Sequence, residues 1–257
     1  MKRLARRQAV ALSLAGLGLL LVTAGCVSET GAQESCADGH GLNAPSGVAI
    51  SLGGKSVYVA SAASDAVARL NRNTTTGAIS QPAGTAGCWS EEGAGPCANG
   101  HALDGAQGVA VSPDGKNIYV ASDISDAVAR FNRNTTTGAI FQPADFHGCI
   151  SESGAGRCED GHGLDAAQAV TVSRDGKNVY AGSRISHAVA RIDRSTTGGG
   201  ITQPAGTSGC ISEDGSGSCA NGHGLDGSGP WELAVSPGGK SLYVAANVAV
   251  ARFNRAP

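Results

Sequence analysis

Four histidines recur 61 residues apart and are the residues in this chain best suited to chemistry. They are His40, His101, His162 and His223. Each is followed three positions later by a side chain that carries oxygen, and these are Asn43, Asp104, Asp165 and Asp226. Imidazoles that converge could bind a transition metal, with the carboxylates orienting the rings. A divalent metal is therefore one interpretation of this set.

The equal spacing also supports a structural interpretation. Each histidine and its acidic partner would then satisfy the backbone of its own loop once per repeat. A true ligand site usually breaks such symmetry, so we favour the structural role. We keep these residues as a candidate binding face, and we assign no catalytic residue, no metal ligand and no cofactor from the sequence.

Two other repeated sets have the same two interpretations. The Ser-Glu pairs, beginning at Ser28, Ser90, Ser151 and Ser212, could offer oxygens to calcium but lack the alternating carboxylates of a calcium loop, which favours solvated acidic turns. Two rows of arginine could bind an anion, but we expect them to cover a neighbouring element with their stems. The rows are Arg69, Arg130, Arg191 and Arg252, and Arg72, Arg133, Arg194 and Arg255. No nucleophile elbow, phosphate loop or zinc-protease helix accompanies them.

Eight cysteines follow the same period and predict four short disulfide loops. The pairs are Cys26–Cys36, Cys88–Cys97, Cys149–Cys158 and Cys210–Cys219. Such usage is typical of an oxidising compartment. LVTAGC at 21–26 also resembles a lipoprotein signal, in which Cys26 would be lipidated. Lipidation would leave Cys36 without a partner, so we rank a lipid anchor second.

The N-terminus is typical of an export signal, because a basic start precedes the apolar run Ala9 to Ala24. That run is too short for a comfortable membrane span, so we expect no integral span. We predict a signal peptide at 1–24, with twin-arginine export as an alternative, and a secreted, periplasmic or cell-surface protein. Its removal leaves 15 basic and 21 acidic residues, a net charge of −6, which argues against a nucleic-acid partner.

The whole chain is built on the repeat that contains these residues. Residues 25–46 match the end of a unit, and full units follow at 47–107, 108–168 and 169–231, with the start of a fourth at 232–257. In the second unit, turn residues separate four apolar runs, which predicts four short strands. The predicted strands are Gly108 to Ser112, Asn117 to Ser122, Ala127 to Asn132 and Gly138 to Gln142.

These strands predict an all-β protein of the β-propeller class. Asp114-Gly115 supplies the positive-φ positions of a tight hairpin. The first strand of each unit is apolar on both of its alternating faces, as in Gly47 to Ile50, which is the pattern expected of a strand buried on both faces. Repeated small sheets that cannot stand alone are the blades of a propeller. We expect three full blades and a partial fourth, with the long cysteine loops crowded on one face around the axis.

The segments SPDGKNIYVAS, SRDGKNVYAGS, SLGGKSVYVAS and SPGGKSLYVAA resemble the YVTN-type propeller repeat. This repeat occurs in surface proteins and in the lactonase-like family related to 6-phosphogluconolactonase, including exported bacterial members. The resemblance implies a ring of about seven blades and a lactone hydrolase. It carries over no catalytic residue, because the matching motifs lie in strands and turns.

Three functions therefore remain open. The preferred one is an exported binding or surface-interaction module for a small molecule, a surface protein or a glycan. The second is a lactone hydrolase, and the third is a truncated propeller without independent activity. The fourth unit stops after Arg255-Ala256-Pro257, so we expect an open edge at Val248 to Asn254 that a second copy of the chain could cover to form a homodimer.

Overall fold

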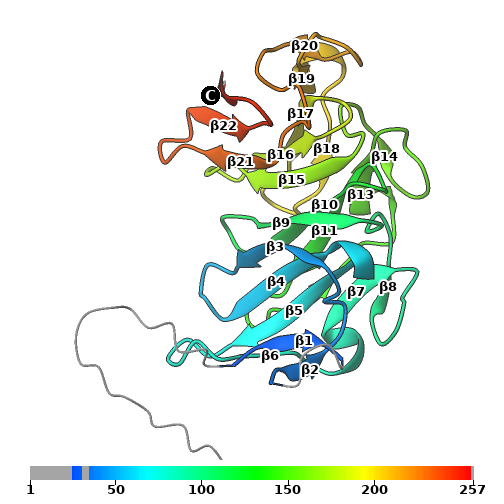
Figure 1. Ribbon diagram of the computed structural model, residues 1–257, viewed down its shortest axis with the longest axis vertical. Coiled ribbons are helices and arrows are strands. Elements are labelled where there is room, and N and C mark those ends of the chain that lie inside the picture. Colours follow the sequence, from blue (N-terminus) through cyan, green and yellow to red (C-terminus); the bar gives the residue numbers. More distant parts are fainter. Residues whose placement is uncertain (1–24, 31–34, 256–257) are drawn as a thin grey trace, which may run out of the picture.

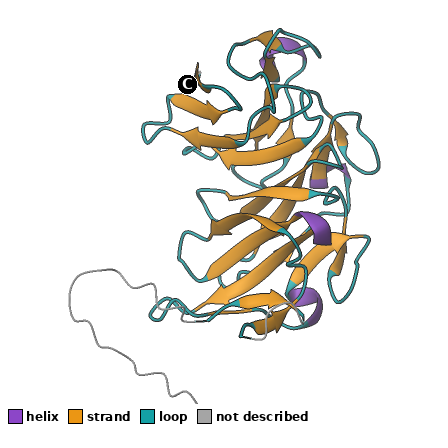
Figure 2. Cartoon of the chain, viewed as in Figure 1, coloured by secondary structure: helices purple, strands orange, loops and turns teal. Residues whose placement is uncertain are grey.

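The computed structural model describes residues 25–30 and 35–255 and is almost entirely β-structure in that part of the chain (Figure 2). The helical elements described are four 3₁₀ turns of three residues each, η1 (Ala62–Ser64), η2 (Gly84–Ala86), η3 (Phe146–Gly148) and η4 (Gly206–Ser208). None of the described helices is long and apolar enough to cross a membrane. The predicted signal peptide at 1–24 lies outside the described residues.

The strands form four successive sheets, which we call blades 1 to 4. Blade 1 contains β3 (Pro45–Ile50), β4 (Ser56–Ser61), β5 (Ala66–Arg72), β6 (Ile79–Ser80), β7 (Cys88–Glu91) and β8 (Ala98–Gly100). Blade 2 contains β9 (Ala106–Val111), β10 (Asn117–Ser122), β11 (Ala127–Arg133), β12 (Ile140–Phe141), β13 (Cys149–Ser151) and β14 (Glu159–Asp160). Blade 3 contains β15 (Ala167–Val172), β16 (Asn178–Ser183), β17 (Ala188–Arg194), β18 (Ile201–Thr202), β19 (Cys210–Ser212) and β20 (Ala220–Asn221). Blade 4 contains β21 (Glu232–Val235), β22 (Ser241–Ala245) and β23 (Val250–Asn254), and β1 (Val27–Glu29) and β2 (Ala37–Gly39) form a separate parallel pair.

Turn chemistry sets the hairpins of each blade, as the sequence predicts. Between β9 and β10, Gly115 has a φ of 69° and donates its backbone N–H to Ser112 O at 2.8 Å. After β11, the Asn134 side chain accepts the backbone N–H groups of Thr136 and Thr137 at 2.9 and 3.0 Å. These contacts satisfy backbone donors that the short turns would otherwise leave unpaired.

The first strand of each blade lies at the inner edge of its sheet, next to the first strand of the next blade (Figure 1). Glycines permit this approach. A Cβ at Gly47 would collide with the carbonyl oxygen of Gln107, and one at Gly108 would lie 2.7 Å from Gln168 O. The blades therefore fan out from a line along β3, β9, β15 and β21, which is the propeller axis.

Two strand predictions need correction. The first strand of blade 2 begins at Ala106 rather than Gly108, because a bulge opposite Ser122 extends the pairing. The predicted fourth strand, Gly138 to Gln142, shortens to β12, and the outer position of the sheet is divided, because β12 pairs with the end of β11 and the unpredicted strand β13 pairs with its beginning. After the disulfide loop the chain returns as β14, a sixth strand that pairs with β13 in parallel.

The cysteine loops do not crowd around the axis, so that expectation is wrong. Three of them link the two outermost strands of blades 1 to 3, for example β13 and β14 of blade 2 at the sheet edge opposite β9, and the fourth links β1 and β2. The four predicted disulfides are confirmed, and all eight cysteines are paired. The loops therefore fasten the rim of the propeller.

The hydrophobic core lies between neighbouring blades. One cluster joins Tyr58 and Val67 of blade 1 to Phe131 and Ile118 of blade 2. Both faces of each sheet carry apolar side chains. Every interior blade therefore needs a neighbour on each side to bury its surface.

Candidate functional site

The axial hollow is a cavity of about 580 Å³ at the propeller axis. Its walls are formed by residues near the beginning of the first strand of each blade and by residues that follow the second strands of blades 2 and 3. Ser46, Gln107, Gln168 and Trp231 occupy related positions at the inner strands of blades 1 to 4, and Asp123 and Arg184 follow the second strands of blades 2 and 3. The side chains of the repeat thus differ in chemistry from blade to blade at the point where the blades converge.

Hydrogen bonds hold the polar groups of the axial hollow in place. Gln107 Nε2 donates to Asp123 Oδ2 at 3.3 Å, and Gln168 Nε2 donates to Pro230 O at 2.9 Å. Arg184 is half-buried, and its backbone N–H donates to Ala166 O at 2.9 Å. The hollow therefore presents one cation, the carboxylates of Asp123 and Glu232, and two oriented amides.

An aromatic side chain completes the hollow. The two-residue insertion near Gly229 to Trp231 places the indole of Trp231 at its edge, 52% exposed. Pro230 packs so closely against Gly182 that a Cβ there would lie 2.8 Å from the Pro230 ring. An exposed indole beside polar groups is an arrangement that binds the apolar face of a sugar ring or a similar flat ligand.

Sequence analysis did not identify the axial hollow, although a signal was present. Residues 61 apart normally agree, yet Ala62, Asp123 and Arg184 differ at one position, as do Ser46 and Gln107 at another. Breaks in a repeat mark positions where folding does not impose one residue type.

The repeated histidines lie at the rim, between the outer strands of adjacent blades. The backbone N–H of His101 donates to Gln142 Oε1 of the next blade at 2.9 Å, and Gln142 Nε2 donates to His101 O at 2.8 Å. The same glutamine clamp joins His40 to Gln81 and His162 to Gln203. The imidazole of His101 faces Gly148, and burial lowers its pKa. A binding role for these histidines remains a prediction.

The acidic partners of the histidines face another carboxylate on the neighbouring blade. Burial raises the pKa of Asp104, and the nearby Asp65 carboxylate raises it further. Asp165 has the same relation to Asp126, and its pKa is raised for the same two reasons. Within residues 25–30 and 35–255, no three His, Cys, Asp or Glu side chains come together as metal ligands.

The glutamates of the Ser-Glu pairs are not simply solvated, which corrects that expectation. Glu91 Oε2 accepts the backbone N–H of Leu103 at 2.7 Å, and Glu213 accepts that of Leu225 at 2.6 Å. Burial raises the pKa of Glu91 and of Glu152. These carboxylates fix the path from the disulfide loop to the next blade.

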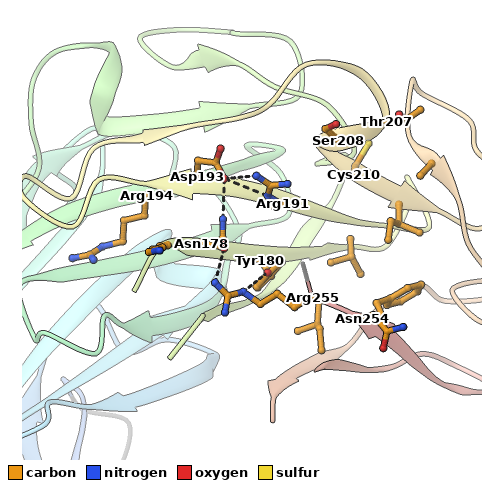
Figure 3. A pocket seen from close by; sticks show the side chains of 16 residues that line it. Asn178, Tyr180, Arg191, Asp193, Arg194, Thr207, Ser208, Cys210, Asn254 and Arg255 are labelled. Atoms are coloured by element: carbon orange, nitrogen blue, oxygen red, sulfur yellow. Dashed lines mark hydrogen bonds and ion pairs between the residues drawn. The ribbon is translucent and has the colours of Figure 1, made fainter. Parts of the chain in front are cut away.

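A second cavity, which we call the side groove, opens between blades 3 and 4 and has a volume of about 560 Å³ (Figure 3). Its floor is apolar, with Val189, Ile211 and Phe253. Polar groups at its edge include Tyr180, whose hydroxyl accepts a hydrogen bond from Arg255 Nε at 3.1 Å. The side groove lies away from the axis, along the third strands β17 and β23.

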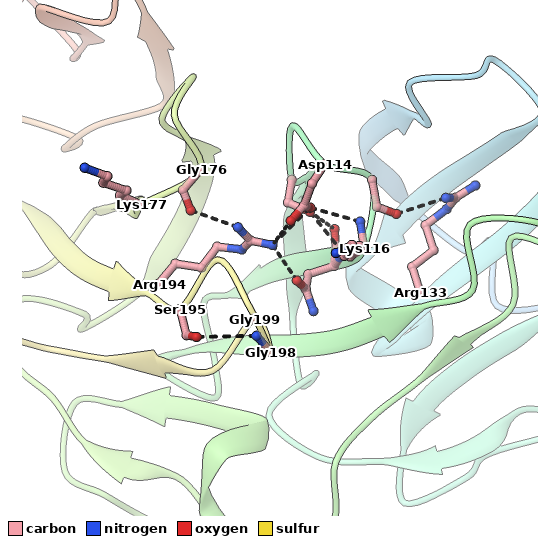
Figure 4. Close-up of polar contacts among 12 residues, drawn as sticks. Asp114, Lys116, Arg133, Gly176, Lys177, Arg194, Ser195, Gly198 and Gly199 are labelled. Carbon is pink, nitrogen blue, oxygen red and sulfur yellow. Dashed lines mark hydrogen bonds and ion pairs between the residues drawn. The ribbon is translucent and has the colours of Figure 1, made fainter.

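Three arginines of the second row, Arg133, Arg194 and Arg255, join neighbouring blades through their guanidinium groups, so the expectation that only their stems cover a neighbour is wrong. Arg194 is almost fully buried, and its guanidinium contacts Asp114 Oδ2 at 2.8 Å and Tyr119 Oη at 2.8 Å, both in blade 2 (Figure 4). Burial favours the neutral form of Asp114, but hydrogen bonds from Ser112 and Arg194 outweigh it and lower the pKa to about 2. Blade 1 has Gly53 at the position of Asp114, so Arg133 contacts Tyr58 and Ser56 there without a carboxylate.

The fold makes this chain a β-propeller protein, and comparison with known proteins refines the class. Residues 97–208 match the family model described as lactonase, 7-bladed beta-propeller. That stretch includes Asp123 and Arg184 of the axial hollow. No curated protein sequence matches the chain.

Solved structures share the fold. A candidate 6-phosphogluconolactonase from Bacteroides uniformis superposes with a TM-score of 0.56 at 17% identity, covering 90% of this chain and 55% of that one. A candidate 6-phosphogluconolactonase from Bacteroides fragilis gives a TM-score of 0.55 at 21% identity, covering 82% and 51%. A protein from Lactobacillus plantarum gives 0.56 at 18% identity, covering 82% and 51%. This chain therefore spans about half the length of these structures.

Proposed function

We propose that this protein is an exported binding module that takes a compact polar ligand in the axial hollow. The observation that supports it is the break in the repeat at the axis. Asp123, Arg184 and Trp231 are unlike their counterparts in the other blades, and all three line one cavity. Because these unlike polar and aromatic side chains converge on one cavity, they favour a ligand there.

The chemistry of the hollow suggests the class of ligand. A guanidinium binds a carboxylate or phosphate, and the Asp123 carboxylate with the two amides can pair with hydroxyl groups. The indole of Trp231 offers an apolar surface beside them. A sugar acid, or the lactone formed from one, presents these three features in a molecule small enough for 580 Å³.

Isothermal titration with a panel of sugar acids and sugar lactones tests this proposal. We expect saturable binding that Arg184→Ala weakens at least about tenfold, since a charge-assisted pair is lost. Arg174→Ala is the matched control, because Arg174 is an exposed arginine on a blade 3 turn outside the hollow. Equal affinity in both variants, or no binding by the panel, would contradict a ligand at Arg184.

A lactone hydrolase at the same hollow is the second candidate, favoured by the family match over 97–208. In this reaction the Asp123 carboxylate would accept a proton from water, whose oxygen attacks the lactone carbonyl. Arg184 would stabilise the oxyanion, and the proton would pass to the ring oxygen as its bond to the carbonyl carbon breaks. Each turnover releases one hydroxy acid.

Titration of released acid at constant pH separates the two candidates. A binding module releases none from any lactone, whereas a hydrolase loses activity in Asp123→Asn and keeps its fold. Export is tested separately, by the intact mass of the protein secreted from an expressing bacterium. Cleavage after Ala24 predicts an unmodified Gly25 terminus, and an acylated Cys26 would overturn both cleavage there and the Cys26–Cys36 pair.

A further inference from the structure

The side groove has the lining that holds an isoleucine at the preceding blade interface. Between blades 2 and 3, Ile201 of β18 is fully buried in a cluster that includes Val128, Ile150 and Ile192. The residues 61 positions further on are Val189, Ile211 and Phe253, and these line the side groove. The apolar floor is therefore shaped for a branched aliphatic side chain.

The polar edge of the side groove matches the donors that hold the segment before that isoleucine. Tyr58 Oη donates to Gly138 O at 2.6 Å and Tyr119 Oη donates to Gly199 O at 3.2 Å. Each of these hydroxyls also accepts a hydrogen bond from an arginine of the next blade. Tyr180 accepts the equivalent bond from Arg255, which leaves its own hydrogen for a carbonyl oxygen in the groove.

The residues whose carbonyl groups accept these tyrosine hydrogen bonds, Gly138 and Gly199, must be glycine. A Cβ at Gly138 would collide with Ser56, and one at Gly199 would collide with Asn117. Asn178 takes the place of Asn117 at the side groove, where it accepts a hydrogen bond from Arg255 at 3.0 Å (Figure 3). Any strand that enters must therefore bring its backbone close to Asn178 without a side chain.

A glutamine completes the pattern. Gln142 and Gln203 each lie two residues after the isoleucine and clamp the backbone of a histidine on the preceding blade. His223 has the corresponding position on blade 3, and its side chain is exposed. Its backbone N–H and C=O are thus placed to receive the side-chain amide of an incoming glutamine.

From these four matches we infer that the side groove docks an extended strand of a partner polypeptide with the sequence Gly-x-Ile-x-Gln. The strand would lie along the outer edge of blade 4, where β23 has no outer neighbour among the described residues. Main-chain hydrogen bonds would supply affinity, and the glycine, isoleucine and glutamine would supply specificity. This surface is separate from the axial hollow and does not depend on the ligand proposed there.

The test uses the disulfide-bonded protein of residues 25–257 and a fluorescent peptide of residues 135–143, TTTGAIFQP. We expect saturable binding by fluorescence anisotropy. In the peptide, Gly138→Ala, Ile140→Asp and Gln142→Ala should each weaken binding at least about tenfold. In the protein, Tyr180→Phe should weaken binding, and Tyr243→Phe, the same position in blade 4, should not.

The same experiment can overturn the inference. Absence of saturable binding, or equal binding of a peptide with these residues scrambled, would remove the docking site. Light scattering at several protein concentrations gives a further test, because a dimer that the peptide does not dissociate would assign the open edge to a second copy of the chain. The peptide variants keep the test valid even if Tyr180→Phe does not fold.

Discussion

The interface between blades 2 and 3 and the interface between blades 3 and 4 use the same residue types in different ways. In the first, Ile150 is fully buried beneath Ile201. In the second, the equivalent Ile211 is half-buried and lines the side groove. The comparison teaches that one surface of a repeat is core when a neighbouring segment covers it and stays partly exposed when no described segment does.

The largest expected effect on stability concerns the equivalent isoleucines of the two interfaces, Ile150 and Ile211. Ile150→Ala should destabilise the protein by about 3 kcal/mol, because it leaves a cavity in a closed cluster. Ile211→Ala should cost about 1 kcal/mol, since Ile211 is already partly exposed to solvent. Urea unfolding of the two variants measures the difference, and equal losses would show that the two interfaces are equally closed.

A smaller effect should be the same at both interfaces. Each of the disulfides Cys149–Cys158 and Cys210–Cys219 closes a loop with a separation of 9 residues. In the chain-entropy model, replacing either pair by serine should cost about 2–3 kcal/mol, because the effect arises in the unfolded chain. Thermal unfolding of both double variants tests this, and a much larger loss at Cys149–Cys158 would point to packing rather than loop closure.

The ion pair of Arg194 with Asp114 predicts a dependence of stability on pH. The pKa of Asp114 is lowered to about 2 in the folded protein, so its contribution is present above about pH 4 and is lost as the pH falls toward 2. The carboxylate is 31% exposed, so screening limits this contribution to about 1 kcal/mol.

Asp114→Asn should therefore reduce stability at pH 7 and make the free energy of unfolding flatter between pH 4 and pH 2. Asp175→Asn is the matched variant, because Arg255 and other hydrogen bonds also lower the pKa of Asp175 to about 2, against the effect of burial. Unchanged acid dependence in both variants would contradict the assignment.

The smallest predicted effect comes from adding an ion pair at the interface between blades 1 and 2, which lacks one at this position. Gly53 occupies the position of Asp114 in blade 1, and a Cβ there would meet no atom within 4 Å. Gly53→Asp should add an ion pair with Arg133 and raise stability by about 0.5 kcal/mol. Gly53→Ala is the control for the backbone contribution, and an equal gain in both variants would mean that Arg133 makes no pair.

Much of the fold follows from the sequence for local reasons. Turns such as Pro113 to Lys116 and the alternation in the first strands identify the blades, and the 61-residue period identifies the disulfides. The divided fourth strand was not predicted, because β12 and β13 are short and depend on pairing with different halves of β11. Local propensity has little influence over strands of two or three residues.

The site could be predicted much less well. The type and spacing of the repeated histidines identified His40, His101, His162 and His223 as candidates. In the structure, a glutamine side chain binds the backbone of His40, His101 and His162 between two blades, and the imidazole rings do not converge. Asp123, Arg184 and Trp231 come together only because three blades converge at one axis. The sequence by itself determined the repeat, its turns and its cysteine pairs, since each depends on residues close along the chain. Only the tertiary structure decided which surfaces are covered, because burial depends on contacts between residues that lie far apart in the chain, in different blades.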